Sequence, residues 1–114
     1  DDKASLYSTK ELYDSVYQEI GIPIVHDIHH HLFCTGSICQ EEAMITAALT
    51  WGDITPVVHY SESRPEEQND PKIKPQAHSD YIYKKIETYG LDVDVMVEAK
   101  AKERAVQRYK EIWK

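Results

Sequence analysis

The stretch from Ile22 to His31 constrains the fold of this chain more than any other. An apolar, β-branched run ends there in a polar cluster that holds an aspartate and four of the six histidines, Asp27, His26, His29, His30 and His31. This pattern predicts a buried strand over about 22–28 that delivers metal ligands at its carboxyl end. Imidazole and carboxylate groups together suit zinc, manganese or iron. A histidine-rich surface loop is the alternative, but the spacing Asp27-x-x-His30 directly after the strand favours a metal site.

Composition limits the class of protein. The chain has 114 residues, 41% of them apolar and 29% charged, as expected for one folded domain. No run approaches the roughly 20 apolar residues that a membrane span needs, and no segment resembles a signal peptide. We therefore expect a soluble, intracellular protein. The net charge of -7 argues against nucleic-acid binding over the whole surface, but it leaves room for a local groove in which bound cations offset the acidity.

The chain contains two cysteines, Cys34 and Cys39. No other feature suggests a secreted scaffold held together by disulfides. We expect both to be reduced thiols, with a metal-binding pair or a disulfide as the alternatives.

Helices and strands are expected to alternate along the chain. The capping-box pattern of Ser8 and Glu11 predicts a helix over about 8–20, which Gly21 ends in the left-handed conformation. The pattern Ser37-x-x-Gln40 predicts a second helix over about 38–51. Further strands are expected at 57–59 and 93–97, and further helices at about 82–90 and 100–113. Three prolines between residues 61 and 76 predict a long loop.

This alternation predicts parallel strands joined by right-handed crossovers. In such folds the functional residues gather beyond the carboxyl ends of the strands. Five candidate ligands occupy such positions: Asp27 and His30 after the first strand, His59 after the second, His78 on the loop above the same face, and Glu98 after the third. Convergence from three strand ends favours the mouth of an α/β barrel.

Four motifs together resemble the C-terminal part of the UV damage endonucleases. They are Asp27-Ile-His-His30, His59-Tyr-Ser61, Ala77-His-Ser-Asp-Tyr81 and Val97-Glu-Ala-Lys100, in this order and at these intervals. The family is similar to endonuclease IV. The resemblance therefore implies a TIM (β/α)8 barrel whose metal cluster incises double-stranded DNA on the 5′ side of ultraviolet photoproducts.

The resemblance also implies roles for individual residues. Carried over motif by motif, it makes five residues metal ligands: Asp27, His30, His59, His78 and Glu98. Asp27 and Glu98 are then the catalytic carboxylates. The implied cofactor is Mn²⁺, with Zn²⁺ or Mg²⁺ as alternatives.

Four further residues have expected supporting roles. Asp80 is expected to orient a metal ligand, with a helix N-cap as the alternative. His26 is expected to lie in the core or beside a ligand. Arg64 and Lys100 are candidate DNA contacts, with plain solvation as the alternative.

The resemblance further predicts that the chain is incomplete. A TIM barrel has about 250 residues, so residues 1–114 are expected to form the C-terminal portion of one barrel domain. Asp1-Asp2-Lys3 would follow directly after a glutamate ligand, and the first strands of the barrel would be absent. Exposed strand edges then predict self-association or pairing with the remainder. Val57 stands where some family members carry a lysine that is open to carboxylation, so any role of that lysine is lost or supplied elsewhere.

Two other functions remain open at this point. A sugar isomerase of the xylose isomerase type also uses Asp, Glu and His at the strand ends of a barrel. A catalytically inactive half-barrel would bind metal or self-associate without turnover. Cleavage of DNA or turnover of a ketose would distinguish the two enzymes.

Overall fold

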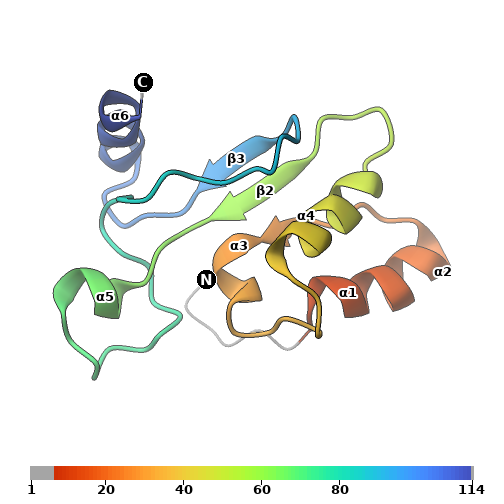
Figure 1. Ribbon diagram of the computed structural model, residues 1–114, viewed down its shortest axis with the longest axis horizontal. Helices are drawn as coiled ribbons and strands as arrows, with labels where there is room; N and C mark the ends of the chain where they lie inside the picture. The colour runs from red at the N-terminus through yellow and green to blue at the C-terminus, as the bar shows by residue number, and fades with distance from the viewer. Residues whose placement is uncertain (1–6, 114) are drawn as a thin grey trace.

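A computed structural model describes residues 7–113 of the chain. Its centre is a parallel sheet of three strands in the order β1-β2-β3 (Figure 1), namely β1 His26–Asp27, β2 Val57–Tyr60 and β3 Asp94–Val97. The predicted α/β class with parallel strands is thereby confirmed, whereas closure into a TIM barrel stays a prediction. The expectation for Asp1-Asp2-Lys3 concerns residues outside the described range.

Short helices surround the sheet. They are α1 Thr9–Leu12, the π-helix η1 Tyr13–Tyr17, α2 Gln18–Ile20, α3 Ile28–His31, α4 Gln40–Leu49, α5 Arg64–Gln68 and α6 Glu103–Ile112. In Figure 1, α1, α2 and α4 lie toward one end of the sheet, and α5 and α6 lie toward the other. Among the described residues, none of the helices has the length and apolar character that crossing a membrane demands.

The first predicted helix is present and begins as expected. The Ser8 hydroxyl accepts from the Glu11 amide at 3.1 Å, and the Glu11 carboxylate accepts from the Ser8 amide at 3.2 Å, so the capping box is complete. Gly21 ends the helix with φ 69°. The outer part of its apolar face is not covered, because Val16 and Ile20 are 40% and 64% exposed.

The second helix begins differently from the prediction. Cys39 is its N-cap, and its sulfur accepts from the Glu42 amide at 3.5 Å, so the predicted capping box of Ser37 is wrong. Ser37 instead has φ 67° and lies in the turn before the helix. A thiol has taken the place of the hydroxyl that usually caps a helix.

Strand β1 is shorter than predicted because its expected first half bonds to side chains. Pro23 has no amide hydrogen to donate to a sheet. The Ile24 amide donates to the Thr50 hydroxyl at 2.8 Å, and the Ile24 carbonyl accepts from Trp51 Nε1 at 2.8 Å. This backbone is therefore attached to the end of α4, and only His26 and Asp27 pair with β2.

The predicted helix over 82–90 is wrong, because residues 81–93 form neither helix nor strand. Amides in this segment donate to acceptors elsewhere: those of Tyr83 and Lys84 to the Glu62 carboxylate, and that of Ile86 to the Tyr109 hydroxyl. The long loop over 61–76 is also corrected, since it contains helix α5. In the segment over 81–93, these amides donate to distant side chains and not to the carbonyls of a helix.

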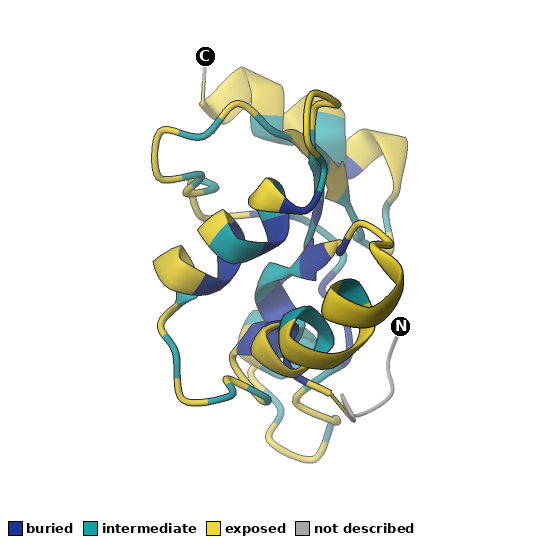
Figure 2. Cartoon of the chain, turned by 90° about the vertical axis from the view of Figure 1, so that its right-hand side faces the viewer, coloured by how far each residue is buried: buried dark blue, intermediate teal, exposed yellow. Residues whose placement is uncertain are grey.

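The core between the sheet and α4 contains a histidine. His26 is fully buried, as are Met44 of α4 and Val58, its pairing partner on β2. Figure 2 shows that the buried residues lie mainly on the inner sides of the helices and on the strands. Gln40 Oε1 pairs with His26 Nε2, and Gln40 Nε2 donates to the Ile28 carbonyl at 3.1 Å. An amide oxygen only accepts, so His26 Nε2 carries the hydrogen and Nδ1 accepts from the Thr9 hydroxyl at 2.8 Å. Neutral His26 therefore joins α1, β1 and α4.

Burial lowers the pKa of His26 below its ordinary value of 6.5, against the opposing effect of the Gln40 hydrogen bond. As the pH falls toward this value, His26 is therefore protonated to a greater extent in the unfolded chain than in the folded chain. We predict that the free energy of unfolding, measured in urea, falls as the pH is lowered from about 7.5 to about 5.5. A His26→Gln variant should show a smaller decrease. An equal decrease in both proteins would contradict this role of His26.

Candidate metal site

The sheet places three candidate ligands on one face, at the carboxyl ends of adjacent strands. The register pairs Asp27 with His59 and pairs His59 with Met96. The Glu98 amide donates to the Tyr60 carbonyl at 2.8 Å, which continues the pairing one residue beyond β3. Because side chains alternate along strands, Asp27, His59 and Glu98 project from the same face.

These three side chains come together. One ligand atom of each lies within 4.8 Å of the other two, and Glu98 Oε1 is 2.9 Å from His59 Nδ1. All three are partly buried. Two carboxylates this close repel one another unless a positive charge lies between them. Two carboxylates and one imidazole form a donor set that fits a divalent cation such as Mn²⁺, Zn²⁺ or Mg²⁺.

Local structure fixes the position of Asp27. It is the N-cap of α3, and its Oδ1 accepts from the His30 amide at 2.9 Å. Its second oxygen, Oδ2, is 3.7 Å from His30 Nδ1. The short helix that follows β1 therefore orients the carboxylate and brings the His30 ring to its side.

His30 and His78 do not belong to the group of three within 4.8 Å, among the residues that the structure describes. His78 is buried, and its ring centroid is 6.0 Å from that of His29. Its backbone forms an antiparallel bridge with Ser63, four residues after His59. The ligand roles of His30 and His78 stay predictions.

The supporting residues occupy different surroundings. Arg64 Nη1 donates to Asp80 Oδ1 at 2.8 Å, and no helix begins at Asp80, so the alternative of an N-cap is wrong. His26 is the core histidine described above. Lys100 is exposed, and Val57 lies two residues before His59 on the same face of β2. The roles of Asp80 beside a ligand and of Arg64 and Lys100 on DNA stay predictions.

A cavity of about 390 Å³ lies beside α3 and the end of β2. Its lining includes His29, Phe33, Tyr60, Ser61 and Glu62. His29 Nε2 and Ser61 Oγ are buried there without a hydrogen-bond partner in the described structure. Burial lowers the pKa of His29, so its ring is held neutral.

Glu62 lies near the candidate site but belongs to none of the motifs recognised in the sequence. The residue is buried, and its carboxylate accepts three hydrogen bonds. The available signal was its position three residues after His59, beyond the end of a parallel strand.

Comparisons with known proteins point to one family. A model of the family UV-endonuclease UvdE matches residues 1–112. The UV DNA damage endonuclease of Bacillus cereus (strain B4264) is 32% identical over 119 residues, which cover 93% of this chain and 34% of that protein. The UV-damage endonuclease of Schizosaccharomyces pombe is 36% identical over 100 residues, which cover 78% of this chain and 16% of that protein.

A solved structure is also similar. The crystal structure of SacUVDE matches with a TM-score of 0.71 and 26% identity, over 96% of this chain and 38% of that one. The chain therefore spans about a third of the length of the bacterial relative and of the solved structure.

Binding of a divalent cation should stabilise the folded chain. At about 100 times its dissociation constant, Mn²⁺ is expected to add about 2.7 kcal/mol to the free energy of unfolding. In Asp27→Asn this gain should be lost, whereas α3 should still form because asparagine is also a good N-cap. Asp53→Asn, at an exposed position, is the matched control. Equal stabilisation of both variants, measured by thermal unfolding, would contradict the site.

Proposed function

Because this chain belongs to the UV-endonuclease family, we propose that it supplies part of the metal site of a DNA repair endonuclease that incises DNA on the 5′ side of ultraviolet photoproducts. The convergence of Asp27, His59 and Glu98 from three adjacent strand ends is the observation that carries the proposal. The family membership disfavours the sugar isomerase considered above.

The charges of the two carboxylates imply that a cation binds before DNA does. Asp27 and Glu98 place two negative charges in a partly buried site, which attracts cations and repels DNA phosphates until a cation is bound. His59 adds a neutral nitrogen donor without further charge. A divalent cation bound there supplies charge stabilisation to a phosphate and lowers the pKa of water.

We assign His30 and His78 to the same centre as further ligands, with Mn²⁺ as the preferred ion. Asp27 Oδ1 accepts from the His30 amide, and Asp27 Oδ2 is 3.7 Å from His30 Nδ1, so the His30 ring lies beside a carboxylate that would hold the cation. His78 reaches the region on a segment that pairs with Ser63, close to the end of β2. With these two histidines the centre would have five ligands, enough for more than one ion.

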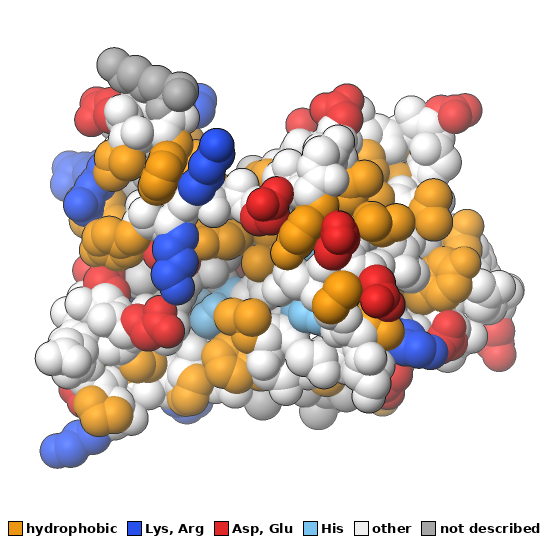
Figure 3. Space-filling model, viewed as in Figure 1, with side chains coloured by type: hydrophobic (Ala, Val, Ile, Leu, Met, Phe, Trp, Pro, Cys, Tyr) orange, Lys and Arg blue, Asp and Glu red, His pale blue; other side chains and the backbone are white. Residues whose placement is uncertain are grey.

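The DNA partner is double-stranded and contains ultraviolet lesions in this proposal. The net charge of -7 confines favourable phosphate contacts to local groups of cations. Figure 3 shows lysine and arginine side chains near a hollow in which histidine surface is visible. The candidate phosphate contacts in this proposal are Lys100, two residues after Glu98, and Arg64, which pairs with Asp80. Acting on DNA is consistent with the predicted intracellular location.

The remainder of the barrel is expected to come from residues beyond this chain. In the described sheet β1 and β3 each pair on one side only, and Met96 on β3 is 55% exposed. Open edges and exposed apolar side chains favour association with further strands. We therefore propose that residues 1–114 form a C-terminal portion of a TIM barrel and that the chain alone is inactive.

Without that remainder, the chain is expected to self-associate through the same edges. Sedimentation velocity over a range of concentrations would detect dimers or larger species. A sharply monomeric species at every concentration would contradict this expectation.

Activity can be tested in a chimera in which this chain replaces the matching third of the Bacillus cereus relative. With Mn²⁺, the chimera is expected to cut an irradiated DNA duplex on the 5′ side of the lesion. Glu98→Gln should lower kcat about 100-fold or more, because a ligand charge is lost. Asp94→Asn, an exposed acid on β3, is the matched control. Equal activities of the two variants would contradict the assignment of Glu98.

A further inference from the structure

The segment over 77–84 carries His78 but has no helix or strand. Its backbone is joined to the residues that follow β2. The Arg64 amide donates to the Ala77 carbonyl at 2.8 Å, and the Ser79 amide donates to the Glu62 carbonyl at 2.8 Å. The segment is thus attached to the chain that leaves His59.

The same segment is also joined to the residues that follow Glu98. The Lys100 amide donates to the Ser79 carbonyl at 2.9 Å, and the Ala101 amide donates to the Asp80 carbonyl at 3.0 Å. The backbone next to His78 is therefore bonded to the residues that follow both β2 and β3. Two of the three clustered ligands, His59 and Glu98, lie at these strand ends.

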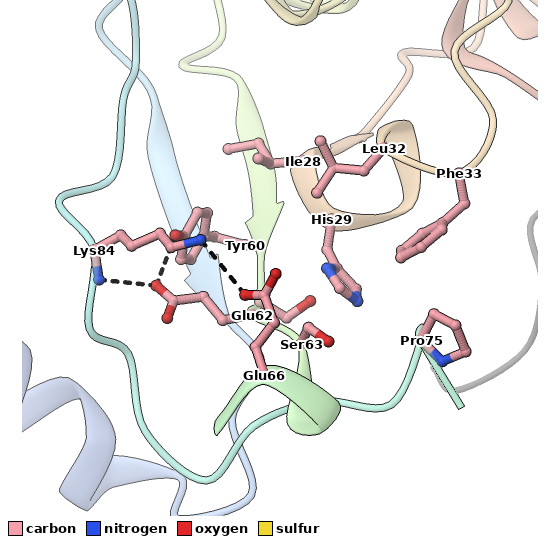
Figure 4. A pocket seen from close by; sticks show the side chains of 11 residues that line it. Ile28, His29, Leu32, Phe33, Tyr60, Glu62, Ser63, Glu66, Pro75 and Lys84 are labelled. Carbon is pink, nitrogen blue, oxygen red and sulfur yellow. Dashed lines mark hydrogen bonds and ion pairs between the residues drawn. The ribbon is translucent and has the colours of Figure 1, made fainter. Parts of the chain in front are cut away.

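The Glu62 side chain completes this attachment (Figure 4). Its carboxylate accepts from the Tyr60 hydroxyl at 2.7 Å and from the amides of Tyr83 and Lys84 at 3.1 Å each. Tyr60 belongs to β2, directly after His59. One buried carboxylate thus joins the strand that carries a ligand to the far end of the His78 segment.

Burial of the Glu62 carboxylate costs free energy unless other groups compensate for the lost hydration. Glu62 is 8% exposed, and within residues 7–113 it forms no salt bridge, since Lys84 Nζ lies 3.6 Å from Glu66 instead. A buried carboxylate is tolerated when donors satisfy its oxygens, and here three donors do so. Burial and the nearby Glu62 raise the pKa of Tyr60, so its hydroxyl remains a donor.

We propose that Glu62 is a positioning residue that holds the His78 segment against the ends of β2 and β3. The inference deepens the proposed function, because it rests on His78 acting as a metal ligand there. Glutamine has the same size, but it has one acceptor oxygen where the carboxylate has two, and its amide nitrogen would face backbone donors. Glu62→Gln should therefore loosen the segment.

Glu66 provides a matched control. Its side chain is 69% exposed, it lines the same cavity, and it pairs with Lys84 at the surface. Glu66→Gln removes the same charge from the same region and weakens an exposed ion pair with the Lys84 side chain, but it leaves the hydrogen bonds from the Tyr83 and Lys84 amides to Glu62 intact. If only the charge matters, both variants should bind Mn²⁺ more weakly to the same extent. If Glu62 positions the His78 segment, Glu62→Gln alone should weaken binding and shift the His78 resonance.

The test uses the 114-residue chain and two measurements. Titration with Mn²⁺ should give a dissociation constant raised about tenfold or more in Glu62→Gln, as for other residues that orient metal ligands. Glu66→Gln should stay within about twofold of the unmodified chain. Nitrogen-proton NMR spectra of the histidine rings, recorded without metal, should show a shift of His78 in Glu62→Gln, while His31 remains in place as an internal control.

The outcomes separate the two proposals. Failure of the unmodified chain to bind Mn²⁺ would contradict the metal site in this chain, and the NMR comparison would still decide the role of Glu62. An unmoved His78 resonance in Glu62→Gln would overturn the positioning role. An equal change of Mn²⁺ affinity in Glu62→Gln and Glu66→Gln would also overturn it, as would a His31 shift as large as that of His78.

Discussion

The parallel pairing of three short strands is the constraint on which the rest of the structure depends. It aligns Asp27 with His59 and places Glu98, two residues beyond the partner of His59, on the same face. Since alternate side chains point to opposite faces, a shift of one residue would turn a ligand into the core and its neighbour outward. His26 and Asp27 show this division, because the first is buried under α4 and the second faces the candidate metal site.

Two acidic side chains, one buried and one partly buried, organise the chain around that sheet where regular structure ends. Glu62 accepts amides from 83–84, and Glu67 accepts those of Asp80 and Tyr81 together with the Tyr83 hydroxyl. These hydrogen bonds lower the pKa of Glu67, against the effect of its burial. Buried amides need acceptors wherever a chain has neither helix nor strand. Negative charge in this region therefore serves the backbone as well as the proposed cation.

The sequence was informative where local signals decide the structure. The capping box at Ser8, the parallel strands and the convergence of Asp27, His59 and Glu98 follow from spacing and from the rule for strand ends. The length of β1, the missing helix at 82–90 and the role of Glu62 depend on bonds between residues far apart in the chain. Periodicity within a short window contains no information about such bonds.

The most direct measurement is anomalous X-ray scattering from crystals of the chain grown with Mn²⁺. We predict a peak within about 2.0–2.5 Å of oxygens of Asp27 and Glu98 and of a nitrogen of His59, at the distances expected for oxygen and nitrogen ligands. Manganese bound only at other acidic groups, with Asp27, His59 and Glu98 directed away from one another, would contradict the proposal that these strand ends form a metal site.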